Sequence, residues 1–142
     1  MKTLITYQTR NGATEKYMNW LAGELNCDIC KFEKTSRHFD FSPYDTVVVG
    51  SGTYAGFMPL KRYLKRHWEQ LKGKKVVAVA VGAAPADDPW SIRSFKKIPE
   101  KIRNEITYFK LMGESLGKEA KEKPSDVKKE KLKPVLAAIL NK

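Results

Sequence analysis

The chain has 142 residues, 42% of them hydrophobic, and a formal net charge of +11. This length predicts a single domain over residues 1–142, and the apolar fraction can build a core without disulfides or metals. No run of eighteen apolar residues is present, which excludes a membrane-spanning helix, and a strand pattern so close to the start leaves no room for a leader peptide, so a cytoplasmic location is expected.

The first part of the chain alternates between strand and helix patterns. Residues 2–7 form an apolar strand pattern, and residues 14–25 carry apolar side chains at helical spacing. Residues 27–32 predict a second strand, whereas residues 34–44 are polar and irregular. Residues 46–50 are mostly β-branched, which indicates a strand buried on both faces.

Two cysteines, Cys27 and Cys30, form a C-x-x-C within the second predicted strand. Residues three apart on a strand point to opposite faces, which is poor geometry for a disulfide or a shared metal. The two histidines, His38 and His67, have no Cys, Asp or Glu at metal-ligand spacing. We therefore interpret the cysteines as ordinary reduced thiols and expect no metal site.

The second part of the chain continues the alternation of helices and strands. Pro59 suits the first turn of a helix, and Gly73 suits its end. Further elements expected from periodicity are a strand at 75–81, a helix at 88–104 interrupted by Pro99, a strand at 106–112 and a last helix at 134–140. Five strands alternating with helices predict an α/β fold with a doubly wound, five-stranded parallel sheet.

The positive charge is distributed unevenly along the chain. Residues 1–59 are neutral overall, whereas residues 60–75 have a net charge of +6 and residues 91–142 a net charge of +7. A basic face can attract nucleic acid, an anionic membrane surface, an acidic protein or an anionic substrate, and a solvated, lysine-rich surface is the alternative. We expect no nucleic-acid partner, because the aromatic residues are not interleaved with the basic ones.

The loops that follow the first, third and fourth strands are the candidate binding site, because ligands bind at the carboxyl ends of parallel strands. The first loop reads Thr9-Arg10-Asn11-Gly12-Ala13-Thr14 and leads into a helix. A helix start favours a phosphate, Gly12 allows close approach, and Thr9 and Thr14 add hydroxyl donors. Arg10 adds a cation or faces solvent. The loop therefore predicts a phosphorylated small molecule, although it is neither a Walker loop nor G-x-G-x-x-G.

The second loop, residues 50–59, holds three glycines that let the backbone lie against a flat ligand. Tyr54 is expected at its tip, where the ring can stack on an aromatic cofactor or pack at the edge of the core. In the third loop, residues 82–90, Trp90 supplies either a second flat wall or an anchor for the helix start. Asp87 and Asp88 are interpreted as helix-start residues.

In combination, these three loops resemble those of flavodoxin. The resemblance rests on the first-loop pattern, on a third strand that runs from Asp45 into Thr53-Tyr54-Ala55-Gly56, and on a small-residue loop after the fourth strand. It covers about residues 2–113, and residues 108–113 are similar to the flavodoxin-domain group that includes flavodoxin-type protoporphyrinogen oxidase. The resemblance implies a flavodoxin-like fold with strand order 2-1-3-4-5 and FMN as the cofactor.

The resemblance also implies roles for individual residues. The residues expected to wrap the FMN phosphate are Thr9, Arg10, Asn11, Gly12, Ala13 and Thr14. In the second loop, Thr53, Tyr54, Ala55 and Gly56, the ring of Tyr54 would stack on the isoalloxazine and Gly56 would lie near flavin N5. Gly82, Ala83 and Trp90 would border its other side. Two features depart from the family: Asn11 stands where many flavodoxins have Thr, and the chain is basic although electron-carrier flavodoxins are usually acidic.

Three functions are compatible with these patterns. The first is an FMN-binding redox protein for electron transfer or flavin-dependent oxidoreduction, with a redox partner protein or a small substrate, anionic in view of the charge. The second is a flavodoxin-type protoporphyrinogen oxidase or dehydrogenase, whose basic helix after Pro59 suits propionates and whose basic face suits peripheral membrane contact. The third is a non-enzymatic, flavodoxin-like binding module with a basic face. The sequence holds no Ser-His-Asp, Cys-His or paired-Glu pattern, so a flavin would supply the chemistry.

Overall fold

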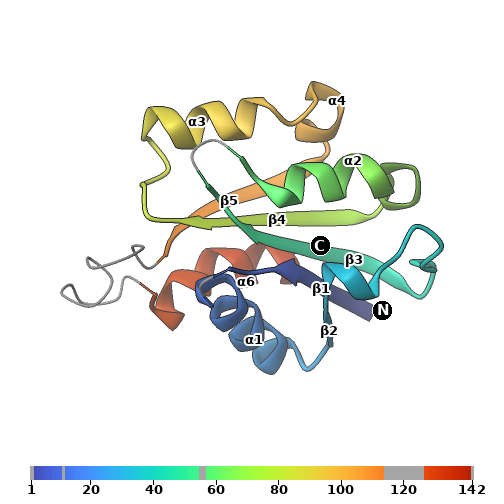
Figure 1. The fold of residues 1–142 in the computed structure, drawn as a ribbon. Coiled ribbons are helices and arrows are strands. Elements are labelled where there is room, and N and C mark those ends of the chain that lie inside the picture. The colour runs from blue at the N-terminus through green and yellow to red at the C-terminus, as the bar shows by residue number, and fades with distance from the viewer. Residues whose placement is uncertain (1, 11, 55–56, 114–126, 142) are drawn as a thin grey trace.

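A computed structural model describes residues 2–10, 12–54, 57–113 and 127–141 (Figure 1). A single parallel sheet with strand order β2-β1-β3-β4-β5 runs through its centre. The strands are β1 (Lys2–Gln8), β2 (Asp28–Lys31), β3 (Tyr44–Gly52), β4 (Lys75–Gly82) and β5 (Ile106–Met112). This order confirms the α/β fold and the 2-1-3-4-5 topology expected from the resemblance to flavodoxin.

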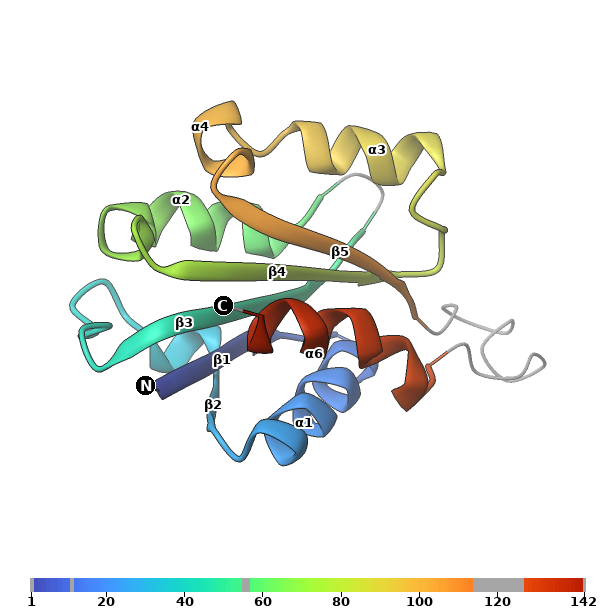
Figure 2. The same cartoon turned by 180° about the vertical axis from the view of Figure 1, so that it is seen from behind.

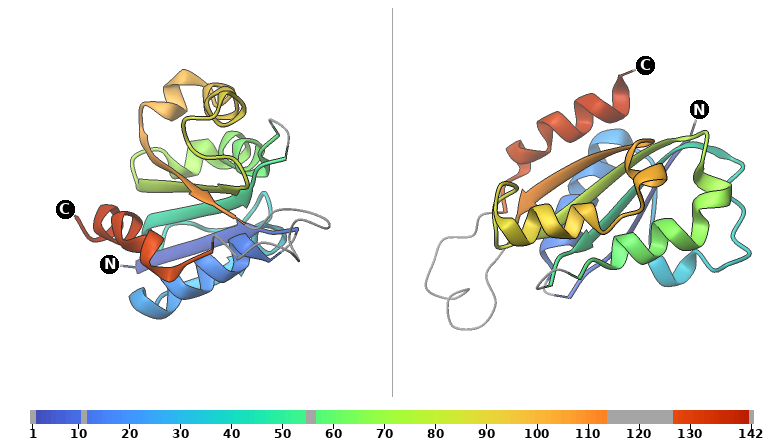
Figure 3. Two further views of the ribbon diagram at one scale, coloured as in Figure 1. Left: turned by 90° about the vertical axis from the view of Figure 1, so that its left-hand side faces the viewer. Right: turned by 90° about the horizontal axis from the view of Figure 1, so that it is seen from above.

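Helices cover both faces of the sheet (Figures 1 and 2). One face carries α1 (Ala13–Leu25) and α6 (Lys133–Leu140), and the other carries α2 (Pro59–Leu71), α3 (Pro89–Lys96) and α4 (Glu100–Arg103). Two short 3₁₀ turns, η1 (Phe32–Lys34) and η2 (Lys129–Leu132), complete the described elements. Seen along the strands, the molecule therefore has three layers, with the sheet between two layers of helices (Figure 3).

The core consists of two apolar clusters, one on each face of the sheet. Val47 and Val49 of β3 face the α2 side, whereas Val48 between them faces the α1 side. All three are fully buried, at 0% exposure. The strand is apolar throughout because both of its faces lie under helices, as the β-branched pattern indicates.

The observed elements differ from the predicted ones mainly at their ends. β3 extends to Gly52, because Ser51 and Gly52 continue the pairing with Ala80 and Val81 of β4. The helical stretch predicted at 88–104 is interrupted at Pro99, as expected, and forms two helices, because Pro99 has a non-helical ψ of 139° just before α4. The last helix begins at Lys133, with Pro134 in its first turn as predicted.

Cys27 and Cys30 lie on opposite sides of the sheet, as the strand geometry predicts. Cys30 packs against the apolar cluster on the α2 side, and Cys27 packs against the cluster on the α1 side. Both thiols are free, and burial raises the pKa of each. A raised thiol pKa lowers the thiolate fraction and with it the reactivity of both cysteines. In the described parts of the chain, no helix is both long and apolar enough to span a bilayer.

Candidate functional site

The three loops chosen from the sequence meet at one edge of the sheet because the strands are parallel. Gln8 at the end of β1 pairs with Ser51, and Gly52 at the end of β3 pairs with Val81. The chain therefore leaves β1, β3 and β4 at neighbouring positions, and the side chains that follow can share one site.

The first loop forms an open helix start. Gly12 is the N-cap of α1, and its φ of 88° is a left-handed conformation that suits glycine. Its N–H donates to Thr9 Oγ1 at 3.0 Å, and no side chain caps the helix in the described structure. Ala13 and Thr14 are buried, at 6% and 2% exposure. The first amides of α1 are thus available to an anion, while Asn11 lies outside the described residues.

In the second loop, Tyr54 and Phe57 form an isolated antiparallel bridge, with backbone hydrogen bonds of 2.8 and 3.0 Å. Tyr54 is half-buried and lies so close to Gly52 that a Cβ at this glycine would collide with its phenol. The guanidinium of Arg10 lies 4.4 Å from the ring centroid, so the first loop contacts the second. Ala55 and Gly56, which are also predicted to bind the cofactor, lie outside the described residues.

Ser51 contributes to this site although the sequence analysis did not select it. Its buried hydroxyl accepts a hydrogen bond from the N–H of Leu60 at 3.1 Å and donates one to the carbonyl oxygen of Gly52 at 3.0 Å. Ser51 thereby connects the end of β3 to the start of α2. The sequence offered only a serine between two glycines, a pattern too common in turns to indicate this role.

The third loop contacts the second at Gly82 and Thr53. The Oγ1 of Thr53 occupies the space that a Cβ at Gly82 would take. The N–H of Thr53 also donates to the carbonyl oxygen of Val81 at 2.9 Å, and the N–H of Gly113 donates to that of Gly82 at 2.8 Å. The predicted residues Thr53 and Gly82 are therefore in direct contact, and Ala83 beside them is exposed.

Lys110 of β5 is a second residue that the sequence analysis did not select. Its ammonium donates to the carbonyl oxygen of Gly82 at 3.3 Å and also to that of Ala84. Burial lowers its pKa to about 8, and the charge of Asp88 opposes this shift. Lys110 holds the third loop against the end of β5, a contact visible only once the β4–β5 pairing is known.

Trp90 stands at the start of α3 and points away from the core. Asp88 is the N-cap of this helix and accepts the N–H of Trp90 at 2.9 Å, as the helix-start interpretation predicts. The indole is 53% exposed, and the guanidinium of Arg93 lies 4.9 Å from its ring centroid. Both interpretations of Trp90, as a flat wall and as an anchor for the helix start, stay predictions.

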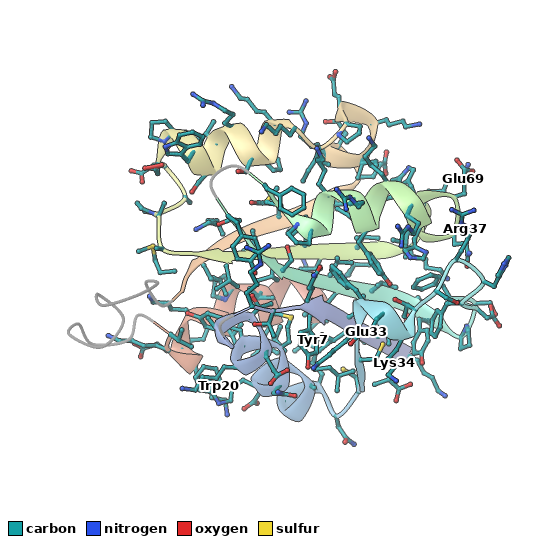
Figure 4. All side chains as sticks on the ribbon, viewed as in Figure 1. Tyr7, Trp20, Glu33, Lys34, Arg37 and Glu69 are labelled. Carbon is teal, nitrogen blue, oxygen red and sulfur yellow. The ribbon has the colours of Figure 1, made fainter. Side chains whose placement is uncertain are left out.

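A cavity of about 570 Å³ adjoins the site on the α2 side of the sheet. It lies between the end of β1, η1 and the start of α2, and it shares Thr9 and Phe57 with the first two loops. Tyr7 and Glu33, which also line it, lie near the meeting point of β1 and η1 in Figure 4. No local sequence pattern indicates this cavity, because its walls come from three separate segments of the chain.

Several solved structures share this fold. Oxidised flavodoxin 2 from Bacillus cereus has 21% sequence identity and a TM-score of 0.61, with 98% of this chain and 97% of that chain covered. The Trp repressor binding protein from Bacillus subtilis has 13% identity and a TM-score of 0.64, with 100% and 99% covered. A flavoprotein from Lactobacillus acidophilus NCFM, solved in complex with FMN, has 14% identity and a TM-score of 0.54, with 78% and 91% covered.

Sequence comparison gives the family. No curated protein matches this chain in sequence. The family model described as a flavodoxin domain matches residues 4–132, which includes every strand of the sheet except the first two residues of β1. The match also includes all three loops of the candidate site. With nearly its full length matched and a sheet of the same topology, the chain belongs to the flavodoxin domain family.

Proposed function

We propose that this protein binds FMN and acts as a redox protein, in electron transfer or in flavin-dependent oxidoreduction. The observation that carries the proposal is the uncapped start of α1, with Gly12 at a φ of 88°, in a loop whose Arg10 contacts the ring of Tyr54. This arrangement offers a helix N-terminus to a phosphate and an aromatic side chain to a flat ring system. Membership of the flavodoxin domain family supports the same cofactor.

The residues of this chain would bind and orient the cofactor, and the flavin, when bound, would supply the transfer of electrons. The amides of Ala13 and Thr14 suit the phosphate, and Thr9 shapes the loop through its bond to Gly12. The contact of Thr53 with Gly82 holds the second and third loops together at the same edge.

Arg10 can form either of two interactions in this proposal, a cation–π contact with Tyr54 or a hydrogen bond to the FMN phosphate. Its contact with the ring of Tyr54 at 4.4 Å is a cation–π pair, worth about 0.5–1 kcal/mol at an exposed site. A hydrogen bond from the guanidinium to a phosphate is worth about 1.5–3 kcal/mol. We therefore expect Arg10 to leave the ring and bind the phosphate when FMN enters, which frees the face of Tyr54 for the isoalloxazine.

Titration of the purified protein with FMN and with riboflavin, followed by flavin fluorescence, tests this proposal. We expect saturable FMN binding that Arg10→Ala weakens about tenfold, since one charge-assisted bond is lost. Riboflavin has no phosphate, so Arg10→Ala should leave its affinity unchanged or raise it up to about fivefold. Arg37→Ala, at an exposed site in the loop before β3, is the matched control. Absence of FMN binding would overturn the proposal, and equal losses for both flavins would overturn the role of Arg10.

The partner of this redox protein is part of the proposal as well. The exposed cations of α2, Arg62, Lys65 and Arg66, favour an acidic redox protein or a small anionic substrate, such as the propionate-bearing substrate of a protoporphyrinogen oxidase. A non-enzymatic module with a basic face is the alternative. The same FMN titration distinguishes the redox protein from the non-enzymatic module, because a module that has lost the cofactor would not bind FMN.

A further inference from the structure

The cavity beside the first two loops has the size and charge of a small-molecule site. Its volume of about 570 Å³ lies within the roughly 300–1,000 Å³ usual for such sites. Lys31, Arg62 and Arg66 line it together with a single carboxylate, Glu33. In the described part of the chain none of these three cations forms an ion pair. The lining therefore has an excess of positive charge available to a ligand.

An aromatic wall borders the same cavity. Phe32 of η1 stacks on Tyr63 of α2, with ring centroids 4.2 Å apart and planes 22° apart. The hydroxyl of Tyr63 lies 2.7 Å from Thr35 Oγ1 in a buried hydrogen bond, which fixes the orientation of the ring. Phe57 comes just before α2 in the chain, and its ring centroid lies 5.5 Å from the guanidinium carbon of Arg62. A rigid aromatic wall lowers the entropy cost of binding a flat ligand.

His67 is a buried polar residue of this cavity. Its side chain lines the cavity, yet the residue is only 2% exposed. Among the described residues its Nε2 has no hydrogen-bond partner. Burial, and then the charge of Arg66, lower the pKa of the imidazole, which favours its neutral form. The rings of Tyr63 and Phe41 lie with their centroids 4.4 and 5.3 Å from that of the imidazole, so His67 is part of the rigid aromatic wall.

We propose that this cavity binds a small aromatic anion. Its carboxylate or phosphate would pair with the guanidinium groups of Arg62 and Arg66, whose planar donors match both groups. Its ring would pack against Phe32 and Tyr63, next to the buried imidazole of His67. This site requires no flavin and goes beyond the proposed function, although Thr9 and Phe57 place it next to the predicted FMN loops.

Calorimetric titration of the full chain, with and without FMN, tests this inference. The probes are indole-3-acetate, AMP and the neutral analogue indole-3-acetamide. We expect saturable binding of at least one of the two anions, and the probe that binds shows whether carboxylate or phosphate is preferred. If indole-3-acetate binds, its amide should bind about tenfold more weakly. Arg62→Gln should weaken the bound anion about tenfold, and Lys65→Gln, which removes an exposed cation of the same helix outside the cavity, less than about twofold.

An NMR measurement tests independently whether the anion binds next to the buried wall of this cavity. Saturation with the bound anion should move the imidazole signals of His67, whereas those of the exposed His38 should stay in place. The inference is overturned if neither anion binds, if Lys65→Gln and Arg62→Gln cause equal losses, or if the signals of His67 do not move. Anion binding by a protein that fails to bind FMN would support this inference and overturn the proposed function, and the reverse result would do the opposite.

Discussion

At the level of single residues, the candidate site depends on contacts between side chains that are far apart in the sequence. Arg10 lies over Tyr54, Thr53 fills the space beside Gly82, and Lys110 holds the loop that follows Gly82. Sequence patterns indicated the loops in which most of these residues lie. They did not indicate which side chains contact each other, because no local pattern shows what an arginine in a loop or a lysine in a strand will contact.

Lys110 makes the stability of the protein depend on pH. Its pKa is about 8 in the folded protein and has its ordinary value of 10.5 in the unfolded chain. Between these values the unfolded chain retains a proton that the folded protein has released, so the free energy of unfolding rises with pH. Urea denaturation of wild type and Lys110→Met between pH 7.5 and 10.5 measures this effect. Relative to the variant, the wild type should gain up to about 3 kcal/mol over this range.

The control for this measurement is Lys65→Met, a substitution of the exposed lysine on α2. Its stability should follow the wild-type pH profile, because an exposed ammonium is solvated in both states. If the profiles of Lys110→Met and wild type ran parallel from pH 7.5 to 10.5, the folded-state pKa of Lys110 would not be lowered, and the role assigned to its burial would be wrong.

At the level of secondary-structure elements, the sequence patterns placed nearly every helix and strand. Residues 75–81 predict a strand buried on both faces because, after Lys75, all of them are apolar. The observed strand β4 includes all of these residues. The patterns failed where backbone pairing continues without an apolar signal, as at Ser51 and Gly52 in β3. The interruption predicted at Pro99 is confirmed, because this proline lies between α3 and α4.

The contact between Gly82 at the end of β4 and Thr53 just after β3 predicts that an alanine is not tolerated at position 82. Gly82→Ala would place a Cβ in the space of Thr53 Oγ1, and a shift of this junction should cost about 1–3 kcal/mol in the free energy of unfolding. Thr53→Ala in the same background should recover part of this loss.

The control is Gly23→Ala in α1, where no described atom outside the helix's own backbone and the neighbouring residues lies within 4 Å of the new Cβ. There the lower backbone entropy of the unfolded chain should stabilise the protein by about 0.5–1 kcal/mol. Equal stability of Gly82→Ala and wild type in thermal denaturation would show that the two loops are not packed together.

Across the protein as a whole, α6 closes one face of the sheet (Figure 2). Val127, Leu132, Val135 and Ile139 are buried in the cluster that also contains residues of α1. Lys75 at the start of β4 donates to the carbonyl oxygens of Ala138 and Ile139 at 3.1 Å, and also to that of Asn141. The C-terminal segment is therefore an integral part of the core.

Removal of residues 127–142 should prevent stable folding. Four buried aliphatic side chains contribute about 1.5–3 kcal/mol each, or roughly 6–12 kcal/mol together, which is comparable to the 5–15 kcal/mol stability of a typical domain. Circular dichroism during urea denaturation should show no cooperative transition for the shortened chain. Leu140→Ser, at a position that is 67% exposed on the same helix, should change the free energy of unfolding by less than about 0.5 kcal/mol. A cooperative transition in the shortened chain would mean that α6 is dispensable.

The amino-acid sequence alone was sufficient to establish the alternation of strands and helices, the parallel α/β fold and the three loops of the candidate site. These features follow from local periodicity, from the turn preferences of glycine and proline, and from the rule that parallel strands place their carboxyl ends at one edge. Only the tertiary structure decided that Arg10 meets Tyr54, that Lys110 holds the third loop, and that a basic cavity with a buried His67 lies beside them. Such contacts arise from the packing of distant segments, and no local pattern encodes which side chains then meet.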